Sequence, residues 1–390
     1  MELKRNQRRP LAGMTLAELQ NVVAGLEMPK FVAKQIAQWL YVKRVTTFEE
    51  MTNISKANRD RLAAEYKVGL SKPTKRTVSQ DGTAKYLFDV GDGKSIEAVY
   101  IPDEDRHTLC ISSQKGCRMN CYFCMTGRQG FHGNLTSNQI INQVLSVPEA
   151  ALLTNVVFMG MGEPLDNLDE VLKVIEILTE PWGMAWSPKR VTVSTVGKKP
   201  ELKVLAEKTS VHIAVSVHNA VHDERESLMP LEKIYPIKDV MQMLGQYDFA
   251  HQRRLSVEYI MWQWFNDDIK HAEALREILP DEHVRVNLIR YHMIPDVAKL
   301  RTSSDDRMTA FRDYLNGRGV MCTIRRSRGE DIAAACGMLA GKVNNAAEKA
   351  EKPEKATKPA KAEKPAKAEK PAKTTKAEKP VKATRASKKR

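Results

Sequence analysis

Three closely spaced cysteines are the strongest chemical signal in this sequence of 390 residues. Cys117, Cys121 and Cys124 follow an expected strand over 108–112, and an aromatic residue stands directly before the last cysteine. Soft thiolates select zinc or iron–sulfur, and a structural zinc site normally has four protein ligands. Three ligands leave one iron of a [4Fe–4S] cluster open. The spacing therefore favours such a cluster over zinc or a loop of free thiols.

A second motif follows the next expected strand, at 155–159. Gly162 and Glu163 stand where α/β folds place their ligands, at the carboxyl end of a strand. Alone, this segment would be an ordinary turn. After a three-cysteine loop it resembles the cofactor element of radical S-adenosylmethionine (SAM) enzymes, which implies that Glu163 accepts a hydrogen bond from the SAM amino group. Further residues at strand ends should face the same cavity: Ser194, Ser216, Val217 and His218.

The surrounding pattern predicts the elements that position these residues. After Cys110, strand-like and helical runs alternate, which is typical of a parallel sheet, open or curled into a barrel. A helix is expected over 168–178, with Asn167 as its N-cap and Glu170 three residues later. A short helix containing Cys336 should follow the last strand. The expected strands are 155–159, 190–195, 211–217, 255–260, 284–289 and 321–326.

The chain divides into four predicted segments. Residues 1–69 form a small helical accessory domain, with helices after Thr15, from 30 to 39 and around 56–66. Residues 70–105 form a β-hairpin connection that turns at Gly91–Gly93. Residues 106–342 form the catalytic core. Residues 343–390 repeat Lys, Pro, Ala and Glu, which predicts disorder.

Charge and cysteine usage restrict the remaining options. The net charge is +14, but the tail holds 16 Lys and Arg against 6 Asp and Glu, so the body carries only about +4. The six cysteines are not expected to form structural disulfides. No secretory signal or membrane span is apparent, so the expected location is cytoplasmic.

Residues from about 12 to 342 resemble the bacterial dual-specificity RNA adenine-C2 methyltransferases of the radical SAM superfamily. The resemblance is carried by Thr108–Cys117, the three-cysteine loop, Gly162–Pro164 and Arg328–Gly337. It implies an α/β fold, a partial (β/α)6 barrel, and 23S ribosomal RNA and transfer RNA as substrates. It also implies an external electron donor such as flavodoxin or ferredoxin, no membrane partner, and a monomer.

The resemblance also assigns chemical roles. Cys336 is methylated by one SAM, and a second SAM is cleaved to a radical that abstracts hydrogen from this methyl group. The resulting methylene radical adds to C2 of adenine. Glu97 then removes the C2 proton, and Cys110 attacks Cys336, which releases the product with formation of a disulfide. Cys322 has no assigned role and is expected to be a buried apolar filler.

One departure and two alternatives remain open. The family commonly has an Asn that contacts SAM after the strand at 284–289, but this sequence has His292 there. An imidazole can also form hydrogen bonds to the adenosine. The nearest alternative function is methylation of adenine C8 with the same cysteines. A second alternative is a non-enzymatic iron–sulfur protein that binds RNA, which would leave Cys110 and Cys336 without a role.

Overall fold

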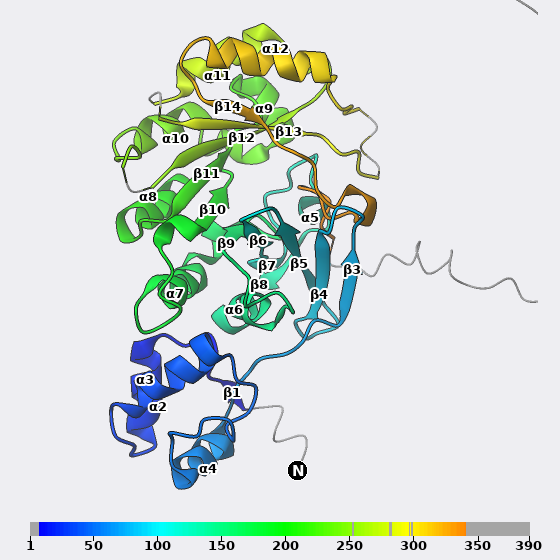
Figure 1. The fold of residues 1–390 in the computed structure, drawn as a ribbon. Helices are drawn as coiled ribbons and strands as arrows, with labels where there is room; N and C mark the ends of the chain where they lie inside the picture. Colours follow the sequence, from blue (N-terminus) through cyan, green and yellow to red (C-terminus); the bar gives the residue numbers. More distant parts are fainter. Residues whose placement is uncertain (1–7, 252, 281–282, 296, 298, 341–390) are drawn as a thin grey trace, which may run out of the picture. The chain divides into compact units, whose positions relative to one another are not determined.

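The computed structural model describes residues 8–251, 253–280, 283–295, 297 and 299–340. The predicted disordered tail therefore lies outside the described residues. Residues 1–342 form one compact unit. Its centre is a ten-stranded sheet with the order β14-β13-β12-β11-β10-β9-β6-β5-β4-β3 (Figure 1).

Seven neighbouring strands of this sheet run parallel to one another, namely β6, β9, β10, β11, β12, β13 and β14. Because parallel strands share one carboxyl edge, the residues that follow them meet at one end of the sheet. The predicted strands are confirmed, each displaced by only a few residues at its ends. Their bounds are β6 His107–Cys110, β9 Asn155–Phe158, β10 Val191–Thr195, β11 His212–Ser216, β12 Leu255–Met261, β13 Arg285–Arg290 and β14 Cys322–Ile324.

Helices connect successive parallel strands. The sheet is not closed, since β14 and β3 are its two edges. Six strand–helix units, from β6 with its helix to β13 with α12, followed by β14, give the predicted partial (β/α)6 barrel. The helices are α5 Met125–Arg128, α6 Ser137–Ser146, α7 Leu168–Thr179, α8 Lys199–Lys208, α9 His222–Leu228, α10 Ile237–Leu244, α11 Ile269–Ile278 and α12 Asp305–Asn316.

The predicted hairpin is present and lengthens the main sheet. Strand β4 (Ala84–Asp89) pairs antiparallel with β5 (Ser95–Pro102), and β5 pairs antiparallel with β6. Gly91 and Gly93 both have positive φ, as the tight turn requires. Strand β3 (Lys75–Val78) completes this edge. A separate two-stranded sheet, β7 (Gln114–Gly116) with β8 (Phe131–Asn134), brackets the three-cysteine loop.

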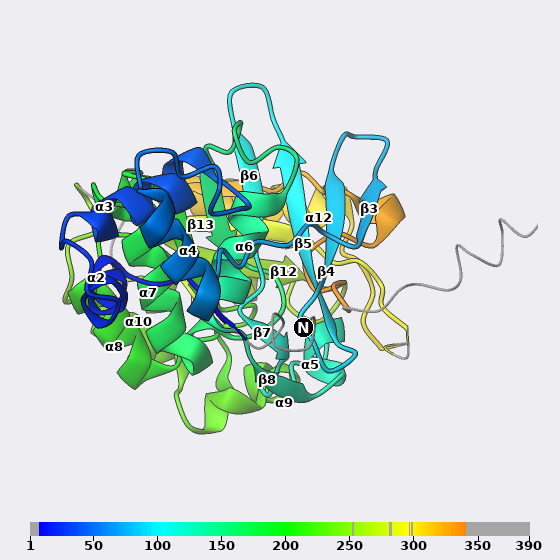
Figure 2. The same ribbon diagram turned by 90° about the horizontal axis from the view of Figure 1, so that it is seen from below.

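The amino-terminal helices are α2, α3 and α4, joined by the π-helical segment η1. Thr15 caps α2 in a reciprocal capping box with Glu18, as its position predicted. Glu18 also pairs with Lys173 on α7 at 2.9 Å, and Figures 1 and 2 show α2 and α3 beside that helix. In the described part of the chain, no helix is both long and apolar enough to cross a membrane. The bounds are α2 Leu16–Gly25, α3 Val32–Ala37, η1 Gln38–Lys43 and α4 Lys56–Glu65.

One predicted cap is wrong. Asn167 precedes α7, but its side chain makes no capping hydrogen bond. Its amide group donates instead to the carbonyl oxygens of Ser113 at 2.9 Å and Leu135 at 2.7 Å. Ser113 O also accepts from the Leu135 N–H at 3.1 Å, but leaving the Leu135 carbonyl without this donor would cost about 1–3 kcal/mol, at least as much as a helix cap typically contributes. The predicted partner Glu170 likewise turns away and accepts from the backbone N–H of Ser137.

Candidate active site

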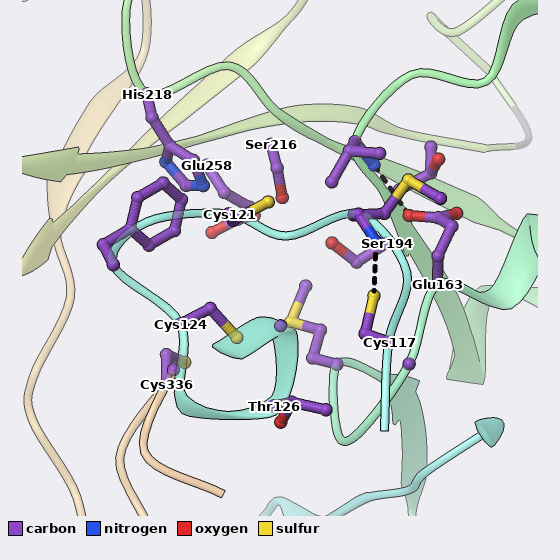
Figure 3. Close-up of a pocket in the computed structure, with 18 of the residues that line it drawn as sticks. Cys117, Cys121, Cys124, Thr126, Glu163, Ser194, Ser216, His218, Glu258 and Cys336 are labelled. Atoms are coloured by element: carbon purple, nitrogen blue, oxygen red, sulfur yellow. Dashed lines mark hydrogen bonds between the residues drawn. The ribbon is translucent and has the colours of Figure 1, made fainter. Parts of the chain in front are cut away.

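A cavity at the carboxyl ends of the parallel strands holds the three clustered thiols (Figure 3). The cavity has a volume of about 150 Å³ and is open to solvent on one side. Cys117 and Cys121 are buried, and Cys124 is partly exposed. The other predicted site residues that line the cavity are Gly162, Glu163, Ser194, Ser216, His218 and Cys336.

The cysteine loop is fixed by backbone hydrogen bonds at both ends. The Cys117 N–H donates to Gly130 O at 3.0 Å, and the Tyr122 N–H donates to Leu228 O at 2.9 Å. Burial raises the pKa of the Cys117 thiol to about 12 and that of Cys121 well above its ordinary value. A metal ligand must be a thiolate, so binding would release these protons.

The donor set fits an iron–sulfur cluster better than a single ion. Within the described residues, no three His, Cys, Asp or Glu side chains converge closely enough to hold one metal ion. The three thiols are instead spread around one cavity, whose wall is also made of apolar side chains such as Met119 and Phe123. Three thiolates around this cavity could bind three irons of a [4Fe–4S] cluster, which would leave the fourth iron without a protein ligand.

Glu163 lies in the same cavity and is buried. One carboxylate oxygen accepts from the Leu165 N–H at 3.1 Å. The other accepts from the Val196 N–H at 3.0 Å, the dashed line at Glu163 in Figure 3. Burial raises its pKa to about 7, although these hydrogen bonds lower it. A cationic amino group bound nearby would favour the charged carboxylate.

Gly162 has a φ of 102° and lies against β7. A Cβ at this position would stand 2.5 Å from the Cβ of Gln114. The Gln114 side chain in turn accepts from the Glu163 N–H at 2.8 Å. Gly162 therefore allows the chain to pass close to β7, and this contact fixes the position of Glu163.

We expect Gly162→Ala to lower the free energy of unfolding by about 2 kcal/mol, because it combines left-handed strain with a backbone-level clash. Urea unfolding measures the change. Gly25→Ala is the matched control, since no atom lies within 4 Å of its added Cβ. It should be neutral or slightly stabilising. Equal stability of the two variants would contradict the packing role of Gly162.

The residues predicted at the ends of β10 and β11 separate into two groups. Ser194, Ser216 and His218 line the cavity. Val217 is fully buried and is not among the lining residues; its carbonyl accepts from the Arg225 Nε at 2.9 Å. Burial and the nearby Arg225 lower the pKa of His218 to about 3. Its Nδ1 accepts from the Ile260 N–H at 3.1 Å, so the neutral ring carries its proton on Nε2.

Cys336 lies on a turn, so the helix predicted around it is wrong. The only helical piece in the described segment after β14 is the 3-10 turn η5, Glu330–Ile332. The following segment is held against the cysteine loop instead. The Met125 N–H donates to Gly337 O at 2.8 Å, and the Thr126 hydroxyl donates to Leu339 O at 2.7 Å. The Cys336 side chain is exposed to the cavity, beside Cys124 (Figure 3).

Cys110 is the buried last residue of β6 and is not among the residues that line the cavity. Burial raises the pKa of its thiol, and the neighbouring Cys336 raises it further. All six cysteines are nevertheless free. The disulfide that the resemblance implied is therefore absent from this state, because the two sulfur atoms are neighbours without being at bonding distance.

Comparisons with known proteins identify the family. The model for the ribosomal RNA large subunit methyltransferase N-terminal domain matches residues 10–68, and that for the radical SAM superfamily matches residues 111–292. The probable dual-specificity RNA methyltransferase RlmN of Parabacteroides distasonis is 56% identical over 86% of this chain and 98% of its own length. The chain belongs to the RlmN family. It is thus a radical SAM RNA methyltransferase, as the sequence motifs predicted.

A second relative and a solved structure extend the match. The dual-specificity RNA methyltransferase RlmN of Alcanivorax borkumensis is 38% identical over 89% of this chain and 94% of its own length. A crystal structure of a radical SAM methyltransferase from Sphaerobacter thermophilus is 37% identical, with a TM-score of 0.80, and the match covers 86% of this chain and 100% of that one. The radical SAM fold therefore extends over the compact unit.

The carboxylate of Glu97, predicted from the RlmN resemblance as a base, is buried and already bound on both oxygens. One forms an ion pair with Lys85 Nζ at 3.1 Å, and the other accepts a hydrogen bond from the Ala340 N–H at 2.8 Å. Lys85 also donates to Ala333 O at 3.2 Å. Glu97 is not among the residues that line the cavity. In this state, Glu97 and Lys85 hold both flanks of the segment that carries Cys336.

His292, the departure from the RlmN pattern, holds the same segment from another side. Its Nε2 is 3.1 Å from the Ser327 hydroxyl, and its Nδ1 is 3.2 Å from a Glu330 carboxylate oxygen. It is buried and does not line the cavity. The imidazole therefore joins the end of β13 to the chain that leads to Cys336. Cys322 is buried on β14, as expected for a filler.

Two site residues were missed in the sequence. Glu258 is buried on β12 and lines the cavity, and burial raises its pKa. Its signal was a carboxylate inside an otherwise apolar strand. Arg225 is completely buried behind the cysteine loop. It pairs with buried Glu232 and donates to the carbonyls of Val196 and Ser216, both at 3.0 Å.

We expect Arg225→Met to lower the free energy of unfolding by about 3–5 kcal/mol, because it leaves the buried Glu232 without its buried cation and with only the half-exposed His222 imidazole as an ion-pair partner. The double variant Arg225→Met/Glu232→Leu should recover part of this loss, since it removes the unpaired charge. Chemical denaturation of all three proteins measures the effect. A single variant as stable as the parent would show that the pair does not support the cysteine loop.

Proposed function

We propose that this chain methylates carbon C2 of adenine in 23S ribosomal RNA and transfer RNA, using a methyl group carried by Cys336. The observation that carries this proposal is the position of Cys336. Its thiol faces the cavity that holds the three clustered cysteines. It is also close enough to Cys110 to raise the pKa of the Cys110 thiol by an electrostatic interaction. A radical SAM enzyme that only binds RNA or cleaves SAM has no need of this second pair of thiols.

We assign a [4Fe–4S] cluster to Cys117, Cys121 and Cys124, and SAM to the adjoining cavity. When bound, these two groups supply the electron and the carbon radical that the reaction needs. Glu163 is suited to accept from the SAM amino group. Ser194, Ser216 and the Nε2–H of His218 offer hydrogen-bonding groups on the same wall. His292 is a weaker candidate for a SAM contact because both of its nitrogens already have partners.

Cys336 is the residue that enters the bonds of the reaction. Adenine C2 is electron-poor and cannot attack a SAM methyl group, so the thiolate of Cys336 takes the methyl first. After a hydrogen atom is removed from this methyl group, its radical carbon bonds to C2 and links protein to RNA, and the unpaired electron left on the adduct would return to the cluster. Once the C2 proton is removed, the Cys110 thiolate attacks the Cys336 sulfur, and the S–C bond breaks with its electron pair going to the methylene carbon. This carbon takes up a proton to become the methyl group, and an external thiol reduces the disulfide formed between the two cysteines.

Removal of the C2 proton is assigned to Glu97, with one structural condition. Its carboxylate must exchange the Ala340 N–H for the proton of the substrate. This exchange requires the segment after Cys336 to move far enough to break the hydrogen bond between the Ala340 N–H and Glu97. RNA binding in the cavity is the event that would displace it.

The remaining assignments follow from the family and the segment boundaries. We propose that residues 1–69 form an accessory domain for RNA, that 70–105 connect it to the core at 106–342, and that 343–390 form a basic tail. We further propose that the protein acts as a cytoplasmic monomer with an external flavodoxin or ferredoxin as reductant. The six free cysteines fit a reducing compartment.

The decisive experiment uses anaerobically reconstituted protein, a 23S ribosomal RNA fragment and SAM with a deuterated methyl group. Nuclease digestion and mass spectrometry should then show labelled 2-methyladenosine. Labelled 8-methyladenosine would establish the C8 alternative. Absence of both, together with no 5′-deoxyadenosine from SAM, would favour the non-enzymatic RNA-binding protein. Protein that takes up zinc in place of iron would contradict the cofactor assignment.

A further inference from the structure

A second cavity lies at the other end of the barrel, where the parallel strands begin. It has a volume of about 310 Å³. Lys189 lies two residues before β10, His212 begins β11, Arg254 directly precedes β12 and Arg285 begins β13. These residues therefore form one arc at the amino edge, opposite the cysteine cavity. The complete lining is Lys189, His212, Phe249, Ala250, His251, Arg253, Arg254, His283, Arg285 and Met321.

This arc is strongly cationic. No Asp or Glu is among the described residues that line the cavity. In the described part of the chain, Lys189, Arg254 and Arg285 have no ion-pair partner. The nearest acid on the same loop, Asp248, pairs with His251 at 3.2 Å.

Arg253 differs from these three because its side chain is already used. It donates to Ala206 O at 2.6 Å and Thr209 O at 3.1 Å, and it packs over the rings of Tyr247 and Phe249. This arrangement fixes the loop before β12 and thereby the position of Arg254. The cationic arc is therefore built on a supported backbone.

The pKa of the His212 imidazole is lowered by burial and by the positive charges that surround it. Burial and then the charges of Arg254, Arg106, Lys189 and Arg285 lower its pKa to about 4. Its Nδ1 accepts from the Arg254 N–H at 2.9 Å, so its neutral form carries the proton on Nε2. Like charges in this arrangement repel one another, and an anion with several oxygen atoms would relieve the repulsion.

We propose that this arc binds backbone phosphates of the RNA substrate, at a second contact remote from the methylated base. This inference rests on the proposed function for the identity of the anion. The strands between the two cavities have five to seven residues. At ~3.3 Å per residue, the arc lies about 20 Å from the cysteine cavity. An RNA stem beyond the target loop can span that distance, and its phosphates match the arc in charge.

The test compares two triple variants that each remove three positive charges. The arc variant is Lys189→Gln/Arg254→Gln/Arg285→Gln. The control replaces exposed cations on α11 and after α12, and is Lys270→Gln/Arg276→Gln/Arg318→Gln. None of these residues belongs to the cysteine cavity.

We expect the arc variant to bind full-length substrate RNA about 10-fold more weakly or worse, with the slope of log affinity against log salt reduced by about 2 relative to the control. Methylation of full-length RNA should show a raised KM with kcat unchanged. Methylation of a minimal stem-loop, too short to reach the arc, should be the same in all three proteins. Equal salt slopes for the arc and control variants would overturn the proposal.

A second measurement separates the two sources of phosphate. Titration with inorganic pyrophosphate, followed by the NMR signal of the His212 imidazole, tests whether the cavity binds the anion alone. A shift in the parent protein that is lost in the arc variant, together with weakened RNA binding, supports the proposal. A shift without any change in RNA affinity would overturn the RNA contact and assign the cavity to a free phosphate compound. If the parent protein methylates neither the full-length RNA nor the stem-loop, the proposed function is wrong. The slopes of log affinity against log salt would still show whether the arc binds RNA.

Discussion

Cys336→Ala is expected to reduce methyl transfer to RNA by about 10³-fold or more, because it removes the atom that carries the methyl group. The three cluster ligands belong to a different segment, so iron content and the visible absorption of the reconstituted cluster should match those of the parent. Mass spectrometry of digested RNA measures the methyl transfer. Mass spectrometry of intact parent protein should show the added methyl group that the variant lacks.

Cys322→Ala is the matched control for this experiment. Cys322 is buried on β14 and does not line the cavity. Its loss should leave methyl transfer near the parental rate and cost only the stability of a small buried side chain. If Cys336→Ala still produced methylated RNA at the parental rate, the methyl group would have to travel directly from SAM, and the assignment of Cys336 would fail.

The features that were predictable from the sequence are those that depend on local spacing. The parallel strands follow from short apolar runs between helical patterns, and the cysteine loop follows from three thiols within eight residues. Glu163 was predictable because it stands within five residues of the carboxyl end of β9. In each case the structural consequence arises within a few residues of the signal, so no knowledge of distant contacts was needed.

The incorrect or missing predictions depend on contacts made across the fold. Alanines at 333–335 favour a helix by propensity, but Gly329, Ala333 and Gly337 have positive φ and end it. The carbonyls of that segment are used by the cysteine loop. Asn167 could not be placed either, because its acceptors lie on two other elements.

Glu97 shows a different limit of sequence-based inference. The resemblance assigned it a chemical role, while the structure adds that its carboxylate binds Lys85 and the Ala340 N–H. The contacts of Glu97, Lys85 and His292 therefore hold the Cys336 segment on both sides of the cysteine. These contacts could not be predicted from the sequence, because the two residues in each of them lie more than thirty residues apart along the chain.

Cys110→Ala is expected to trap the protein covalently on its RNA. In the proposed sequence, Cys336 becomes bonded through its methylene carbon to adenine C2, and only attack by a second thiol breaks the S–C bond. Cys110 is placed for this attack, since it ends β6 next to Cys336. The variant should therefore form a protein–RNA species that survives denaturing electrophoresis and disappears on nuclease treatment. Dithiothreitol should not release it, because the link is a thioether. The double variant Cys110→Ala/Cys336→Ala should form no such species, and free methylated RNA at normal yield from Cys110→Ala would show that another group performs the release.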